Sequence, residues 1–280
     1  MATRTWLDAG TSPGDWGSTT NWSGGAVPVS NDDVVIASGS RDITGSLNQS
    51  AVNLNSLKIT SGYKGNIGGP GASLQINVTG ASPTNCQFAM GGQFIYFSGN
   101  TAAAAGCKVD STGTGTMYIT GGTLTGSGAG TGAALTCGKQ GNLVLTGVTI
   151  ASGDVISCGM NITSDSVLAG SGRIADLTNG RFYSTASNVG TIRLRGQANF
   201  TTFGSALTVG TLDVGTGSTY THSSTGTITT ANVFTGGIFM NGGYGNFTVT
   251  TANLYTGSSY TPSVAGATGT AGTQNNIGSG

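Results

Sequence analysis

The sequence predicts an all-β protein, an irregular parallel β-helix, and three observations favour this fold class. Gly accounts for 51 of the 280 residues, and the chain contains no Glu and few Lys or Arg, so good helix formers are scarce. Short runs of Val, Ile, Leu and Thr alternate apolar with polar residues and are separated by Gly, Asn and Ser. Related segments also recur along the chain, as the stacked turns of a solenoid require.

The repeats indicate which residues occupy equivalent positions in successive turns. Residues 230–234 match residues 251–255, and residues 117–121 resemble residues 143–147 at an offset of 26. An offset of 21 relates two sets of residues, namely Leu212, Val233 and Leu254, and Gly215, Gly236 and Gly257. We expect the first set to be buried, because one face of each strand must point into the stack. Two β-sandwich domains remain the alternative, since the same alternation suits antiparallel strands.

The chain divides into three predicted regions. Residues 1–40 form an N-terminal cap or docking segment, residues 41–260 form the β-helix, and residues 261–280 form a C-terminal arm that is flexible or ordered by assembly. All three tryptophans, Trp6, Trp16 and Trp22, lie in the first region. We interpret them as a hydrophobic cap over the open end of the core, with an aromatic ligand platform as the alternative.

Charge and cysteine content narrow the classes of partner. Charged residues make up 7% of the chain and the net charge is zero, which argues against direct nucleic-acid binding. No stretch reaches the roughly 18 apolar residues of a membrane span, and no secretory signal is visible. After Asp213 the only titratable side chain near neutral pH is His222, which predicts that this part faces other subunits. The four cysteines, Cys86, Cys107, Cys137 and Cys158, lack zinc-ligand spacing and are expected to be buried free thiols.

No motif predicts an enzyme, a metal site or a cofactor site. Asp154 and Asp176 could stack on neighbouring turns with Asp165 on another side, but solvated surface positions are the favoured interpretation. Ser12 lies in a nucleophile-elbow pattern at residues 10–14, yet Pro13 lacks the N–H that an oxyanion needs. His222 is expected at the surface or packed, and the glycine run at residues 126–132 lacks phosphate-loop spacing.

One basic cluster is a candidate interaction site. It contains four arginines, namely Arg173, Arg181, Arg193 and Arg195. Arg193 and Arg195 are two residues apart and therefore share one strand face. They could meet an acidic protein surface or a polyanionic glycan, and a solvated face is the alternative.

The segment Asn21–Pro28, followed by Asp32–Ile36, resembles the opening of Gly/Thr-rich β-helical structural proteins of tailed-phage virions, and more weakly that of autotransporter-type passenger domains. Residues 119–124 and 145–150 are similar to the turns of these proteins. The resemblance implies a virion structural role and carries over no catalytic residue. We therefore expect a capsid decoration (cement) protein, made in the host cytoplasm, that binds the major capsid protein or other virion proteins and forms a homotrimer. The alternatives are a tail fibre or spike protein, a secreted or cell-surface glycan-binding adhesin, and a β-helical glycan depolymerase.

Overall fold

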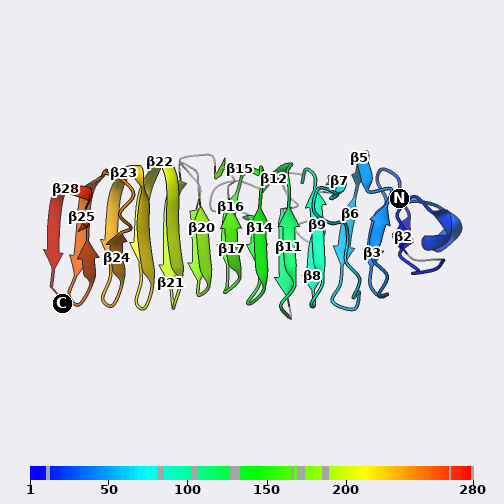
Figure 1. Cartoon of the computed structure of the whole chain (residues 1–280), viewed down its shortest axis with the longest axis horizontal. Coiled ribbons are helices and arrows are strands. Elements are labelled where there is room, and N and C mark those ends of the chain that lie inside the picture. The colour runs from blue at the N-terminus through cyan, green and yellow to red at the C-terminus, as the bar shows by residue number, and fades with distance from the viewer. Residues whose placement is uncertain are drawn as a thin grey trace.

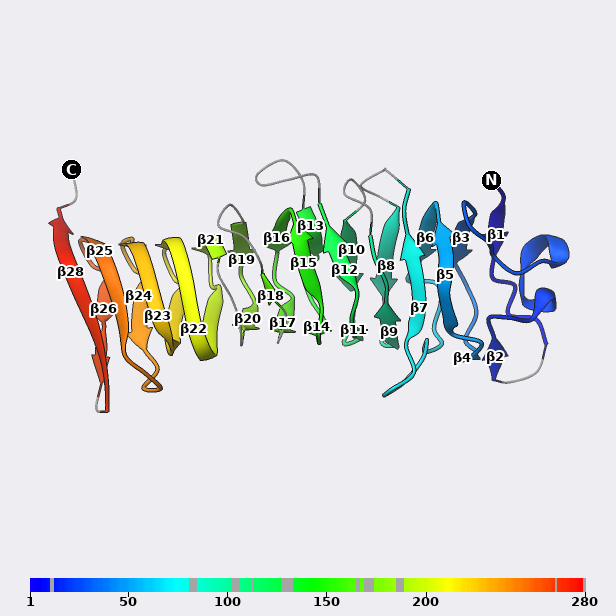
Figure 2. The same ribbon diagram turned by 90° about the horizontal axis from the view of Figure 1, so that it is seen from above.

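The computed structural model shows a rod-shaped, all-β solenoid of about 10 turns, built on parallel strand pairing. It describes residues 1–10, 13–80, 85–101, 106–111, 113–126, 133–164, 167–168, 174–184, 189–264 and 266–278. Successive turns lie side by side along the rod, with the N-terminus near one end and the C-terminus at the other (Figures 1 and 2). The predicted parallel β-helix is confirmed, and the β-sandwich alternative is wrong because the strands that build the turns pair in parallel with strands one turn away.

Face 1 of the solenoid is a continuous ladder that runs the whole length of the rod. Its register places each residue opposite one that lies 17 to 30 positions later in the chain, and toward the C-terminal end Ile192, Leu212, Ala231 and Ala252 form one column. Its strands are β1 (Thr3–Thr5), β3 (Asp33–Ile36), β6 (Ser56–Ile59), β8 (Cys86–Met90), β10 (Cys107–Ser111), β13 (Ala133–Cys137), β16 (Asp154–Ser157), β19 (Ile174–Thr178), β21 (Val189–Arg195), the second halves of β22 (Asn199–Val214) and β23 (Thr219–Val233), β25 (Phe247–Tyr255) and β28 (Ala267–Ile277).

The other strands form two further faces. Face 2 contains β9 (Phe94–Ser98), β11 (Thr116–Ile119), β14 (Asn142–Leu145), β17 (Asn161–Ser164), β20 (Arg181–Ser184), the first halves of β22 and β23, β24 (Ile238–Asn241) and β26 (Ser259–Thr261). Face 3 contains β5 (Asn48–Leu54), β7 (Leu74–Val78), β12 (Thr123–Thr125), β15 (Thr149–Ser152) and β18 (Val167–Leu168). Short pairs complete the sheet content, with β2 (Gly14–Asp15) beside β4 (Ile43–Gly45) and β27 (Ser263–Val264) antiparallel to β28.

The core is a set of columns in which like side chains stack from turn to turn. On face 2 the inward column runs through Ile95, Met117, Leu143 and Ile162, all buried. It continues as an aromatic column of Phe182, Phe200, Tyr220 and Phe239, whose neighbouring ring centroids lie 4.9–5.9 Å apart. Each turn therefore buries its apolar face only against its neighbours, as the alternation in the sequence predicts.

The offset of 26 between residues 117 and 143 is confirmed, but one of the offsets of 21 is wrong. Met117 pairs with Leu143 and Val233 with Leu254. However, Val233 pairs on its other side with Val214, an offset of 19, so that Leu212 stands opposite Ala231. Leu212 and Val233 are fully buried, whereas Leu254 is only half-buried.

The turn glycines show the same slip of two residues. Gly217, Gly236 and Gly257 have φ values of 76°, 72° and 79° and are linked by backbone hydrogen bonds from turn to turn. The left-handed backbone at this corner favours Gly, so Gly217 takes the place that the repeat alignment gave to Gly215.

The parallel stack extends beyond the predicted range of 41–260 at both ends. At the N-terminal end β1 pairs with β3, and β3 with β6. At the C-terminal end β28 pairs with β25 over most of its length. Residues 267–277 of the expected arm are thus the last strand of face 1. Their Gly, Thr and Asn content gives a weak strand signal, and the backbone ladder to β25 supplies the order instead.

Candidate functional site

The three tryptophans close the N-terminal end of the core. Trp6, Trp16 and Trp22 are each no more than 1% exposed, and their rings meet edge to face, with centroids 5.2 Å apart for Trp6–Trp22 and 4.7 Å apart for Trp16–Trp22. Trp22 Nε1 donates to the Trp16 carbonyl at 2.7 Å. The segment that carries Trp22 lies between two 3-10 turns, η1 (Thr19–Asn21) and η2 (Ser23–Gly25). The rings pack as a hydrophobic cap and do not form an open aromatic platform.

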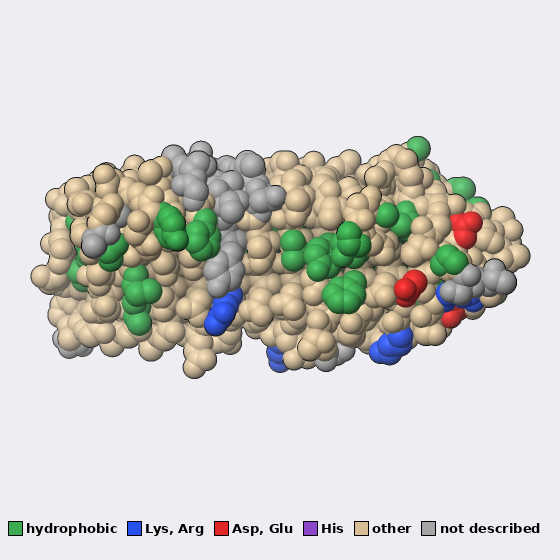
Figure 3. Space-filling model, viewed as in Figure 1, with side chains coloured by type: hydrophobic (Ala, Val, Ile, Leu, Met, Phe, Trp, Pro, Cys, Tyr) green, Lys and Arg blue, Asp and Glu red, His purple; other side chains and the backbone are tan. Residues whose placement is uncertain are grey.

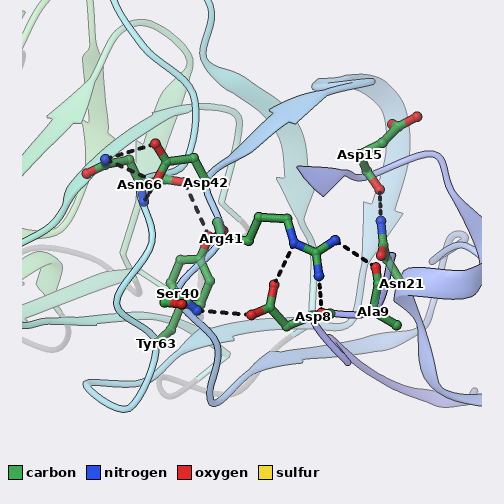
Figure 4. Close-up of polar contacts among 9 residues, drawn as sticks. All are labelled: Asp8, Ala9, Asp15, Asn21, Ser40, Arg41, Asp42, Tyr63 and Asn66. Atoms are coloured by element: carbon green, nitrogen blue, oxygen red, sulfur yellow. Dashed lines mark hydrogen bonds and ion pairs between the residues drawn. The ribbon is translucent and has the colours of Figure 1, made fainter. Parts of the chain in front are cut away.

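A polar network ties this cap to the first turns of the solenoid (Figure 4). The Arg41 guanidinium pairs with the Asp8 carboxylate at 3.3 Å and also donates to the carbonyls of Asp8 and Ala9. The Tyr63 hydroxyl donates to the Arg41 carbonyl at 2.7 Å. One arginine therefore joins the loop after β1 to the turn before β4.

A second ion pair fixes the other side of the cap. Arg4 Nε lies 3.2 Å from Asp32 Oδ2, and the same carboxylate accepts from the backbone N–H groups of Ala2 and Val29. Burial raises the pKa of Asp32, but these hydrogen bonds and the Arg4 charge outweigh burial and lower the pKa below its ordinary value. Asp33 points away from Asp32 and accepts from Asn55 and Ser56.

The braced cap carries exposed apolar side chains. Leu7 is 53% exposed and Val29 is 56% exposed, and each lies within a few residues of one of the two ion pairs. A rigid end that presents apolar groups to solvent is suited to contact with another macromolecule.

The basic cluster does not form a single patch. Arg193 and Arg195 share face 1 as expected, but each faces an aspartate: Arg193 Nε lies 3.7 Å from Asp213 and Arg195 Nη2 lies 2.8 Å from Asp176. Arg181 is exposed at the start of β20 on face 2, and Arg173 lies outside the described residues. The described arginines are therefore divided between two faces.

The acidic residues considered for catalysis do not pair with one another. Asp176 stands opposite Ile156 on face 1 and binds Arg195, whereas Asp154 is buried and stands opposite Ala133. Asp165, Ser12 and residues 127–132 of the glycine run lie outside the described residues. In the described part of the chain no group of three His, Cys or Asp side chains is arranged to hold a metal ion.

His222 is the centre of a buried polar cluster on face 2. Its Nδ1 lies 2.9 Å from the Tyr220 hydroxyl, and its Nε2 lies 3.4 Å from the Ser224 hydroxyl. Thr202 on the preceding turn accepts from Ser223 N and from Ser224 Oγ. Burial lowers the pKa of His222 to about 4, so the ring is neutral at physiological pH and belongs to the core.

A ladder of amide side chains runs along face 1, a feature that the sequence analysis missed. Asn275 donates to Asn253, Asn253 to Asn232, and Asn232 to the Asp213 carboxylate, each at 2.8 Å. Two residues earlier in each turn, Thr211, Thr230, Thr251 and Thr273 form a parallel column. The repeated Thr-Ala-Asn at 230–232 and 251–253 was the available signal. The ladder locks side chains in place and so stabilises the stack.

Three of the four cysteines are buried free thiols, as expected, whereas Cys158 is exposed and corrects that prediction. Cys158 lines a shallow hollow of about 550 Å³ on face 1, with Lys108, Lys139, Thr136 and Gln140 also around it. Neither lysine takes part in an ion pair with a described carboxylate. Asp110 also lines the hollow, which therefore offers two ammonium groups, one carboxylate, and hydroxyl and amide groups to a ligand.

Exposed apolar side chains gather in the C-terminal third of the rod. Among the described residues, half of the exposed large apolar side chains lie between 203 and 264, and we call them the apolar patch: Phe203, Ile238, Met240, Tyr244 and Val264. On the face in Figure 3, apolar groups lie over this end and also over the middle of the rod, while the visible Lys, Arg and Asp side chains lie toward the middle and the N-terminal end.

No helix in the described part of the chain has the length and apolar character of a membrane-spanning segment. No protein-family model matches the chain, and comparison with curated proteins and with solved structures likewise finds no match.

Proposed function

We propose that this chain is a structural protein of a phage virion, a capsid decoration protein that stabilises the head through protein–protein contacts. The observation that carries the proposal is the braced cap end. Two ion pairs hold that end rigid, and it presents Leu7 and Val29 to solvent. A preformed surface loses little conformational entropy on binding, so apolar contacts there contribute fully to affinity.

The rod behind the cap suits such a role. Each turn buries columns of apolar side chains, and the outward Asn and Thr residues form ladders within the molecule. The two strongest site candidates of the sequence, the tryptophans and Arg193 with Arg195, take part in packing and in ion pairs. The proposed partners are the major capsid protein or other virion proteins, and further copies of this chain.

The test is co-sedimentation of the purified chain with phage heads assembled from the major capsid protein encoded in the same genome. We expect saturable binding that the double change Leu7→Asp and Val29→Asp weakens by about tenfold or more. Phe94→Asp is the matched control, because Phe94 is exposed to a similar extent, 47%, and lies away from the cap. Absence of binding to assembled heads by the folded chain overturns the proposal.

The hollow on face 1 favours a second candidate, an adhesive protein that binds an acidic glycan. Lys108 and Lys139 would face carboxylate or sulfate groups, and Thr136 and Gln140 would bind hydroxyls. Affinity electrophoresis in gels that contain an acidic or a neutral polysaccharide tests it. Glycan binding is supported if only the acidic gel retards the protein, if the double variant Lys108→Ala with Lys139→Ala is no longer retarded, and if Lys64→Ala still is. Unretarded migration of the wild-type protein in both gels would contradict it.

A further inference from the structure

We infer that the apolar patch in the C-terminal third is a self-association surface, and that its partner is the same surface of another copy of this chain. This inference goes beyond the proposed docking on a capsid, because it concerns the opposite end of the rod and assigns the surface through which copies of this chain associate.

The patch draws its side chains from neighbouring turns of the C-terminal third. Ile238 and Met240 are two residues apart on β24 and both point outward, 37% and 39% exposed. Tyr244 follows β24 and lies against Phe203 of β22, with ring centroids 6.3 Å apart. A side chain at the neighbouring Gly243 would lie 3.6 Å from Val264, which places Val264 at the margin of the same patch.

The composition of the patch is that of an interface core. Tyr, Phe and Met are enriched where proteins meet, and charged residues are depleted there. Tyr244 is 75% exposed, an unusual position for an aromatic side chain that serves only the monomer.

The charge distribution identifies the partner. All 20 charged side chains of the protein lie at or before Asp213, so the whole segment that forms the patch, apart from Phe203 and its strand, is free of formal charge. A surface that covers the patch must itself lack charge, because a charge buried against apolar groups loses its hydration and gains no partner. The same patch on a second copy, which lies in the charge-free segment after Asp213 apart from Phe203, meets this requirement. Identical patches facing each other across a symmetry axis also give a closed assembly.

The experiment is sedimentation velocity of the full chain over a wide range of concentration. We expect reversible self-association, with the dissociation constant raised about tenfold or more by Met240→Lys and by Tyr244→Lys. Tyr244→Phe keeps the apolar ring and should keep the assembly. Ile156→Lys is the matched control, since Ile156 is 38% exposed on face 1 outside the patch, and it should leave association unchanged.

Each outcome decides the inference. A dimer or trimer that both lysine variants dissociate, while Ile156→Lys does not, supports it. A wild-type chain that stays monomeric overturns the inference, and the patch would then be assigned to contact with a different protein. Self-association that the patch variants do not weaken also overturns it, because another surface must then be responsible. Head binding is measured separately with the cap variants, so failure of one proposal is distinguishable from failure of the other.

Discussion

At the scale of single residues, His222 shows how a titratable group can be part of a core. The imidazole lies between Tyr220 and Ser224, and the column continues to Thr202 on one side and Asn241 on the other. These neighbours are neutral hydrogen-bonding groups, which suit a neutral ring and offer no counter-charge to an imidazolium ion. The folded state therefore holds the proton on His222 less tightly than the unfolded state does.

This difference predicts that stability falls in mild acid. Because burial lowers the pKa of His222 from 6.5 to about 4, the unfolded chain binds the proton first as the pH drops. The contribution of the neutral His222 ring to the free energy of unfolding is up to about 3 kcal/mol. It is fully present above pH 6.5 and is lost as the pH falls through 4. Urea denaturation at a series of pH values measures it. His222→Gln, which cannot titrate, should flatten this part of the profile, and an unchanged slope in that variant would assign the effect to other groups.

At the scale of the strand, the ladder on face 1 has a direction that its residues impose. Asn232 and Asn253 each donate to one neighbour and accept from the other, whereas Asp213, at the end of the ladder, only accepts. An amide can do both and a carboxylate can only accept. The order Asp, Asn, Asn, Asn is therefore the one that satisfies every member.

The ladder predicts losses of stability of different size for two similar substitutions. Asn253→Asp keeps the acceptor for Asn275 but sets a carboxylate against the Asn232 oxygen, and we expect a loss of about 2 kcal/mol in the free energy of unfolding. Asp213→Asn keeps the acceptor at the end of the ladder and loses only the exposed pairing with Arg193, so we expect less than about 1 kcal/mol. Equal losses from the two variants, measured by urea denaturation, would contradict a directional ladder.

The inward columns of the same turns predict a stronger contrast. Val233→Asp places a carboxylate in a dry stack between Val214 and Leu254 and should prevent folding. Thr230→Asp changes an outward residue of the same strand and should leave the fold intact. Soluble expression and far-ultraviolet circular dichroism distinguish them, and a folded Val233→Asp protein would show that this column is not dry.

The strands themselves could be predicted from the sequence, but their exact register could not. Alternation marks Val233 and Leu254 as inward residues whatever their partners are. The pairing of Val214 with Val233 escaped because this turn is two residues shorter than the next, and the two extra residues of the next turn lie in the loop between Asn241 and Phe247.

The site residues show the same limit. The grouping of the three tryptophans followed from the need to close the core. In contrast, the pairing of Arg193 with Asp213 depends on the register between turns. The separation of Arg181 from Arg193 depends on which face each strand joins, and composition carries no information on either.

At the scale of the whole molecule, the two ends of the rod are closed in different ways. The N-terminal end is covered by buried tryptophans and two ion pairs. The C-terminal end is covered by β28, where Gln274 and Asn276 stand over the columns of Ala252 and Leu254, and Gln274 donates to Asn276 at 3.4 Å. The first cap is apolar packing over a long-range network, and the second is one strand held by β25 along most of its length and by the short β27.

This asymmetry predicts different results for removal of the two ends. In a solenoid each turn contacts only adjacent turns, so deletion of residues 266–280 should expose Ala252 and Leu254 and loosen β25 while the remaining turns stay folded. Deletion of residues 1–32 removes all three tryptophans. It leaves Val34 and Ile36, which are fully buried in the intact chain, at an open end of the core, and we expect unfolding of the first turns or aggregation.

Hydrogen exchange measured for each strand tests the effects of both deletions. After the C-terminal deletion, protection should fall in β25 and persist from β3 to β14. Protection lost along the whole rod would instead show that the solenoid unfolds as one cooperative unit, in which β28 is as important to the core as the tryptophan cap.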